Sequence, residues 1–201
     1  MTLHQISLFF GGVLLVVVVA MFVHSWLDKR RIRASLLPLA ARFPGQVVQE
    51  SVWVYPRFEG TAFGRRFDFF FTVAKAGRQH LLYAVYSLKS SIATDLLLVK
   101  SDFYKPVAAE AALSEQSGAV VAGLHAGYQA RSNHPEAAAA LWSRGRVGEA
   151  IAPLSQFTSL QLGPDAVVVG KTYDGLSDVS PEKIGQDVEA LHRLAVAMET
   201  A

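Results

Sequence analysis

An uninterrupted apolar stretch near the N-terminus constrains this chain more than any other feature. Residues 6–27 read ISLFFGGVLLVVVVAMFVHSWL and carry no formal charge. A helix over these residues is about 33 Å long, which is enough to cross the roughly 30 Å hydrocarbon core of a bilayer. Because a lone segment in lipid must satisfy its backbone hydrogen bonds internally, a helix is the conformation to expect. We therefore predict a short N-terminal tail over 1–5 and a transmembrane helix over 6–27.

A cleaved secretory signal peptide is the alternative interpretation of this stretch. Such a peptide starts with Lys or Arg, has an apolar region of about 7 to 15 residues, and ends at a small-x-small cleavage site. Residues 1–5 contain neither Lys nor Arg, the apolar run is longer, and Ala20-Met21-Phe22 does not match the cleavage pattern. These differences favour an uncleaved span.

The basic residues next to the span predict its orientation. They all follow the span, as Lys29, Arg30, Arg31, Arg33 and Arg42. The positive-inside rule places the basic flank in the cytoplasm. We predict a single-pass protein of the bacterial inner membrane with the N-terminus outside and the C-terminal domain in the cytoplasm. The bacterial origin is inferred from a composition rich in Ala, Val and Arg.

Residues 28–45 form a basic juxtamembrane segment. Residues 28–42 hold five basic residues and one acidic residue, whereas 43–201 hold 14 basic and 16 acidic residues. The alkaline pI of about 8.9 therefore comes from this segment, and the rest of the chain gives no sign of nucleic-acid binding. The segment either binds anionic lipid headgroups, at about 1 kcal/mol per basic residue, or only sets the topology. The candidate lipid contacts are Trp26, Lys29, Arg30, Arg31 and Arg33.

Apolar residues in this segment recur at helical spacing, which predicts that the helix continues beyond the membrane. They are Ile32, Leu36, Leu39 and Phe43. Pro38 is expected to kink or restart the helix, and Pro44-Gly45 to end it.

Small residues inside the span offer a face for helix packing. Ser7 and Gly11 are four residues apart, and Gly12 extends the small patch. Such spacing allows a second helix to approach closely. Other membrane proteins are therefore the expected partners.

From Gln46 onward the hydrophobic period changes from 3.6 towards 2, so we predict a globular domain over 46–201. Its turns are too short for crossover helices, which predicts mainly antiparallel pairing. The expected class is α+β, with the sheet first and late helices packed on one face. The predicted strands cover 46–55, 58–64, 65–74, 79–88, 95–101, 119–130, 157–162 and 166–171. The predicted helices cover 107–116, 147–152, a helix capped by Asn133, and a last helix capped by Ser180 with Pro181 in its first turn.

The sequence contains no complete match to the catalytic or metal-binding motifs that it partly resembles. Gly170-Lys171-Thr172 resembles the end of a P-loop, but Asp165 stands where its first glycine is required. The loop 173–178 lacks the spacing of an EF-hand, and the chain has no Cys. The histidines show no familiar ligand spacing, including His80, His125, His134 and His192. We predict that the protein is not an enzyme and uses no cofactor or metal.

One aromatic residue stands out as a candidate interface residue. Strand alternation places Phe70 on the opposite face from Phe67, Phe69 and Phe71, which are expected in the core. An exposed ring there would suit contact with another protein.

Two functional hypotheses follow. The first is a non-catalytic, membrane-anchored interaction module, an accessory or assembly subunit of a larger inner-membrane complex of respiratory, photosynthetic or transport type. The alternative is a membrane-tethered sensing domain that binds a small apolar ligand or a lipid.

Overall fold

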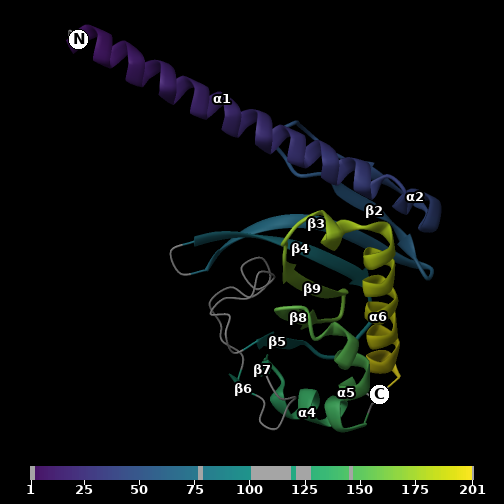
Figure 1. The fold of residues 1–201 in the computed structure, drawn as a ribbon. Coiled ribbons are helices and arrows are strands. Elements are labelled where there is room, and N and C mark those ends of the chain that lie inside the picture. The colour runs from purple at the N-terminus through teal and green to yellow at the C-terminus, as the bar shows by residue number, and fades with distance from the viewer. Residues whose placement is uncertain (1–2, 77–78, 101–118, 121–127, 145–146, 201) are drawn as a thin grey trace.

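The computed structural model describes residues 3–76, 79–100, 119–120, 128–144 and 147–200. A long helix leads into a nine-stranded antiparallel sheet, and the later helices pack against the sheet (Figure 1). The predicted α+β class with an antiparallel sheet is confirmed.

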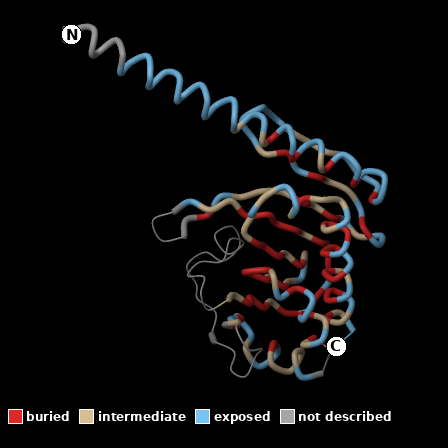
Figure 2. Tube along the Cα trace, in the orientation of Figure 1, coloured by how far each residue is buried: buried red, intermediate tan, exposed pale blue. Residues whose placement is uncertain are grey.

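Helix α1 spans Leu3–Leu36, and its N-terminal half extends away from the domain. Residues 10–24 of α1 are exposed, as their pale blue colour in Figure 2 shows, with Leu14 at 66% and Met21 at 68%. Among the described residues, one helix is long and apolar enough to cross a membrane, and it is this one.

The helix restarts and then ends at the predicted prolines. After Leu36 a turn contains Pro38, and the short helix α2 follows over Leu39–Arg42. Phe43 then adopts an extended backbone with φ of −124°, directly before Pro44-Gly45. The interruption follows from the ring of Pro38, which removes a backbone donor and fixes φ.

The sheet pairs strands that are distant in sequence. In spatial order it runs β1-β2-β3-β4-β9-β8-β5-β7-β6, and every neighbouring pair is antiparallel. The hairpin of β3 and β4 therefore lies beside the hairpin of β8 and β9, joined by the β4–β9 pair. The bounds are β1 Gly45–Val48, β2 Arg57–Ala62, β3 Arg65–Ala76, β4 Gln79–Lys89, β5 Leu96–Lys100, β6 Ala119–Val120, β7 Tyr128–Ser132, β8 Ser159–Leu162 and β9 Ala166–Thr172.

The core lies between one face of this sheet and the later helices. These are α4 Pro135–Arg144, α5 Val147–Ile151, the 3-10 turns η1 Ala152–Leu154 and η2 Leu176–Val179, and α6 Pro181–Glu199. Helix α6 begins as predicted, because the Ser180 hydroxyl accepts a hydrogen bond from the Lys183 amide at 3.2 Å and Pro181 opens the helix. Its apolar stripe is fully buried against the sheet, at Ile184, Val188, Leu191 and Leu194.

The first predicted strand is wrong over most of its length. Strand β1 ends at Val48, and a loop follows to Pro56. Polar side chains close this loop: the Gln49 amide donates to the Val54 carbonyl at 3.0 Å, and the Ser51 hydroxyl accepts from the Trp53 amide at 3.3 Å. Such side-chain bonds compete with a sheet ladder and favour a turn.

Gly60 lies inside β2 opposite Gly45. A Cβ at either glycine would meet the backbone of the other strand, so both positions require glycine. The bend falls at Phe63 and Gly64, whose φ angles of 54° and 75° form a two-residue hairpin turn.

The predicted cap at Asn133 is also wrong by one residue. Helix α4 begins at Pro135, and the His134 carbonyl accepts from the Ala138 amide at 2.9 Å. The Asn133 amide bonds to the Asp95 carboxylate instead, at 3.1 Å. The predicted helix over 147–152 is α5, which ends at Ile151 and is followed directly by η1, which contains Pro153.

Two predicted elements fall partly or wholly beyond the described residues. The predicted helix 107–116 lies outside them. Of the predicted strand 119–130, the structure gives β6 and the start of β7, and His125 lies in the undescribed part between them.

Candidate functional site: the junction between α1 and the domain

The last turns of α1 are part of the domain core. Ile32 and Leu36 are 0% exposed, and Leu39 of α2 is equally buried. These residues join the same cluster as β2, β3 and α6. The apolar spacing seen in the sequence thus faces the domain, and α1 has no separate linker to it.

Polar contacts also fasten α1 to the domain. The Ser35 hydroxyl donates to the Val179 carbonyl of η2 at 2.9 Å. The Lys29 ammonium, which donates to the Ser25 hydroxyl of the same helix at 2.9 Å, lies 5.1 Å from the ring centroid of Tyr55 in the domain. Lys29 is only 7% exposed, so its charge is directed at protein groups.

Aromatic rings lie beside this contact between α1 and the domain. Tyr55 and Tyr173 both pack on Phe71 of β3, with centroid distances of 5.2 and 5.3 Å. Burial, and then the negative charge of Asp28, raises the pKa of Tyr55 and raises the pKa of Tyr173 to about 12. Both hydroxyls therefore stay neutral at physiological pH.

The loop between β1 and β2 reaches α1 further toward its N-terminus. The Trp53 ring meets the Phe22 ring edge-on, with centroids 5.1 Å apart. The domain thus contacts α1 from Phe22 to Leu36.

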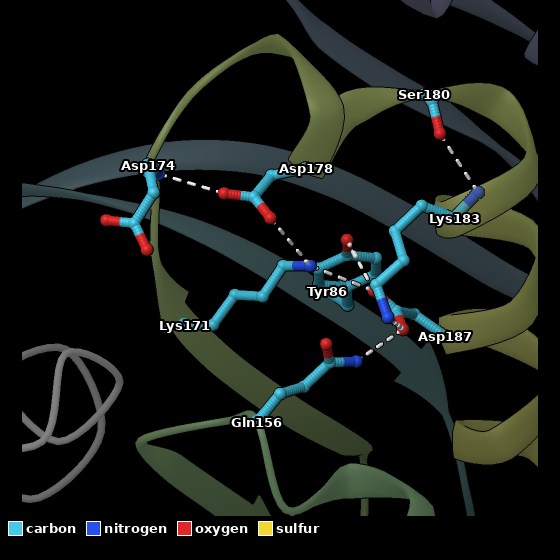
Figure 3. Close-up of polar contacts among 8 residues, drawn as sticks. All are labelled: Tyr86, Gln156, Lys171, Asp174, Asp178, Ser180, Lys183 and Asp187. Atoms are coloured by element: carbon cyan, nitrogen blue, oxygen red, sulfur yellow. Dashed lines mark hydrogen bonds and ion pairs between the residues drawn. The ribbon is translucent and has the colours of Figure 1, made fainter.

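A second candidate site is a buried polar network centred on Asp187 of α6 (Figure 3). Its carboxylate accepts from the Lys171 ammonium at 3.1 Å, the Tyr86 hydroxyl at 3.0 Å and the Gln156 amide at 2.6 Å. Lys183 forms an ion pair with it at 3.3 Å. Lys171 also lies 3.6 Å from the Asp178 carboxylate.

The network is closed rather than open to a substrate. The side chains of Lys171 and Asp187 are 5% and 3% exposed, and the Lys171 ammonium lies 5.7 Å from the ring centroids of Tyr86 and Phe157. Burial, and then the Asp187 charge, raises the pKa of Tyr86 well above its usual value, so its hydroxyl remains a donor. The arrangement ties α6 and η2 to β4 and β9.

Sequence reasoning did not find this network, although one signal was present. Asp187 interrupts the apolar stripe of α6 between Ile184 and Leu191. Lys171 lies inside strand β9, which confirms that the Gly170-Lys171-Thr172 segment is no phosphate-binding loop. A charge on the buried face of each element predicts a partner, but not which one.

Comparison with known proteins gives a likeness in fold. No protein-family model matches the chain, and no curated protein matches it significantly. The chain is similar to the crystal structure of the mycobacterial trehalose monomycolate transport factor A, TtfA, with a TM-score of 0.52. The identity is 13%, and the match covers 83% of this chain and 95% of TtfA. At this identity the likeness shows a shared fold.

The predicted lipid-contact residues do not share one environment. Trp26, Arg30, Arg31 and Arg33 are exposed, and the Arg30 guanidinium lies 5.4 Å from the Trp26 ring centroid. Lys29 differs because it is buried against Ser25 and Tyr55. Headgroup contact by the exposed members stays a prediction.

Gly11 and Gly12, in the predicted span, make no contact that an added Cβ would reach. A Cβ at Gly11 or Gly12 would have nothing within 4 Å, so both sites are open to another helix. Ser7 lies in α1, but its side chain is outside the described part. Helix packing on this face stays a prediction.

Phe70 lies on the opposite face of the sheet from Phe67 and Phe69, as alternation predicts. It is half-buried rather than exposed, because it packs on a small cluster of Ala74, Tyr83 and Val85. Its role at an interface stays a prediction.

The described acidic residues and histidines do not gather into a metal site. The described residues contain no group of three or more His, Asp or Glu that could hold a metal ion. In the loop 173–178, the Asp178 carboxylate accepts from the Asp174 amide at 2.8 Å and faces Lys171.

An ion pair at the end of α6 should make the stability of the protein depend on pH in the acid range. Arg65 donates twice to Glu199, at 2.6 Å for each bond, and the Ser91 amide adds a third at 2.9 Å. The bond from Arg65 is the main reason that the pKa of Glu199 falls from 4.5 to about 2. Its stabilisation is present above pH 4.5 and is lost as the pH falls towards 2.

We therefore expect Glu199→Gln to lower stability at pH 7 and to have little effect near pH 2. The measurement is the urea midpoint of the full chain in mild detergent, taken at intervals between pH 2 and 7. Glu189→Gln is the matched control, because the pair of Glu189 with Arg193, at 3.7 Å, is exposed. Parallel acid curves for wild type and Glu199→Gln would contradict the assignment.

Proposed function

We propose that this protein is a single-span, membrane-anchored accessory factor of a transport assembly in the bacterial inner membrane. Helix α1 anchors it with the N-terminus outside, and the domain works in the cytoplasm. It acts without catalysis, through contacts with other membrane proteins. The observation that carries the proposal is the continuity of α1 with the core: Ile32 and Leu36 are fully buried in the domain.

This continuity suits an accessory role. An anchor built into the core holds the domain at a fixed height next to any partner in the same membrane. Confinement to a surface raises the effective concentration of the domain towards such a partner without a strong binding site.

The likeness to TtfA supports the transport type over the respiratory and photosynthetic types. TtfA is described as a transport factor for trehalose monomycolate, and the match covers nearly all of it. A lipid or glycolipid is therefore the class of cargo that we propose for the assembly. The closed Lys171–Asp187 network supports a non-catalytic role, because its charged groups face one another.

The alternative, a domain that binds a small apolar ligand, has less support. A hollow of about 270 Å³ lies between α5 and α6, but Glu149 and Arg193 line it. Charged walls do not suit an apolar ligand, because their desolvation costs free energy.

The test starts from the full-length protein, extracted in mild detergent from its own membranes. Its native size is measured, and the proteins that comigrate with it are identified by mass spectrometry. We expect a defined assembly that contains a membrane transport protein. Gly11→Leu should weaken it by filling the small face of α1, whereas Val17→Leu, also exposed, should not. A lone monomer would overturn the proposal.

A further inference from the structure

The loop between β1 and β2 carries an apolar tip that the fold does not bury. Val52, Trp53 and Val54 are consecutive, and they are 52%, 60% and 47% exposed. Three adjacent apolar side chains at a loop tip are unfavourable in water, because each leaves apolar surface hydrated. Such a tip indicates a partner that is itself apolar.

Three backbone groups of this tip are hydrogen-bonded within the loop. The Val54 carbonyl accepts from the Gln49 side chain at 3.0 Å, and the Val54 amide donates to the Ser51 carbonyl at 3.2 Å. The Trp53 amide donates to the Ser51 hydroxyl at 3.3 Å. Each of these bonds lowers the free-energy cost of placing the loop near lipid, where an unpaired backbone group is unfavourable.

The charges near the tip are confined to its base. Glu50 and Arg57 flank the loop and form an ion pair at 3.3 Å. Both side chains are exposed, so they can stay in water or among headgroups. The tip between them carries no charge that would need to leave water.

The position of the tip along α1 points to the bilayer. Trp53 contacts Phe22, which lies seven residues before Lys29, or about 10 Å nearer the N-terminus of the helix. Figure 1 shows the connection from β1 to β2 running beside α1. If the apolar part of α1 lies in lipid, Trp53 lies on the membrane side of Lys29, at the depth of Phe22 in the predicted span.

We propose that the β1–β2 loop is a second membrane-contact element, with Val52, Trp53 and Val54 inserted at the headgroup–acyl boundary beside α1. Tryptophan suits this depth, because its ring is apolar and its indole N–H can reach water or headgroups. The inference rests on the proposed anchoring by α1. It adds a second point of contact, which would fix the rotation of the domain about the α1 axis.

The test uses the three tryptophans of the chain, Trp26, Trp53 and Trp142. Replacing two at a time with Phe gives full-length variants that each report one position. Each is reconstituted alone into vesicles of phosphatidylcholine and phosphatidylglycerol, with or without bromine on the acyl chains. Brominated lipid quenches a tryptophan that contacts the acyl region.

We expect strong quenching of Trp53 and Trp26 and none of Trp142, which lies in α4 away from α1. If Trp26 is quenched and Trp53 behaves like Trp142, the loop proposal is overturned while the anchor stands. That result would instead leave the tip for a partner protein. If neither Trp26 nor Trp53 is quenched, the proposed anchoring itself fails.

Discussion

Asp187→Ala should lower the free energy of unfolding by about 3–5 kcal/mol, the usual cost of breaking a buried ion pair. Asp187 is 3% exposed, and its loss leaves Lys171, Tyr86 and Gln156 without their shared acceptor. The main source of the penalty is a buried ammonium whose remaining counter-charge is the more distant Asp178 carboxylate, 3.6 Å away. Urea unfolding of the full chain in mild detergent, followed by circular dichroism, measures it.

Lys183→Met is the matched control, because Lys183 binds the same carboxylate but its side chain is 35% exposed. Its loss should cost about 0–1 kcal/mol, because its ammonium is partly solvated and Asp187 keeps its bonds to Lys171, Tyr86 and Gln156. Replacing both buried partners, as Lys171→Met with Asp187→Leu, should recover much of the loss. If Asp187→Ala and Lys183→Met lowered the free energy of unfolding equally, the buried network would not be what holds α6 to β4 and β9.

Leu36→Ala should lower the free energy of unfolding by about 2–5 kcal/mol, the range for emptying a buried leucine site. The next residue gives the control: Leu36 is 0% exposed and Leu37 is 54% exposed. Leu37→Ala should change stability by no more than about 0.5 kcal/mol. The same unfolding measurement distinguishes them, and similar values would mean that α1 is not part of the core.

The same packing bears on where an independent domain begins. A fragment starting at Gln46 lacks Ile32, Leu36 and Leu39, which fill the core beside α6. We expect that fragment to unfold without a cooperative transition, and one starting at Asp28 to fold. The predicted boundary at 46 would stand only if the shorter fragment folds cooperatively.

Local sequence patterns predicted the elements whose causes are local. Strand β3 follows from the alternation of Phe67 and Phe69, and α6 follows from Ser180, Pro181 and an apolar stripe. The loop after Val48 was missed because its β-rich residues are overridden by turn bonds from Gln49 and Ser51. A propensity for strands cannot show that a side chain will replace the ladder.

The candidate sites depended on contacts between distant residues. The spacing of Ile32 and Leu36 predicted that the helix continues beyond residue 27, but not that this part would lie against β2 and η2. Lys171 and Asp187 meet only because β9 and α6 pack together. Trp53 reaches Phe22 across a loop whose course depends on the β1–β2 pairing.

If α1 spans a membrane as proposed, its unbroken course determines how the thickness of the bilayer acts on this protein. Membrane helices tilt, by about 20° on average, to match their apolar length to the bilayer thickness. Since α1 runs from Leu3 to Leu36 and ends inside the core, any such tilt turns the sheet by the same angle. Bilayer thickness would then select which edge of the domain faces its neighbours.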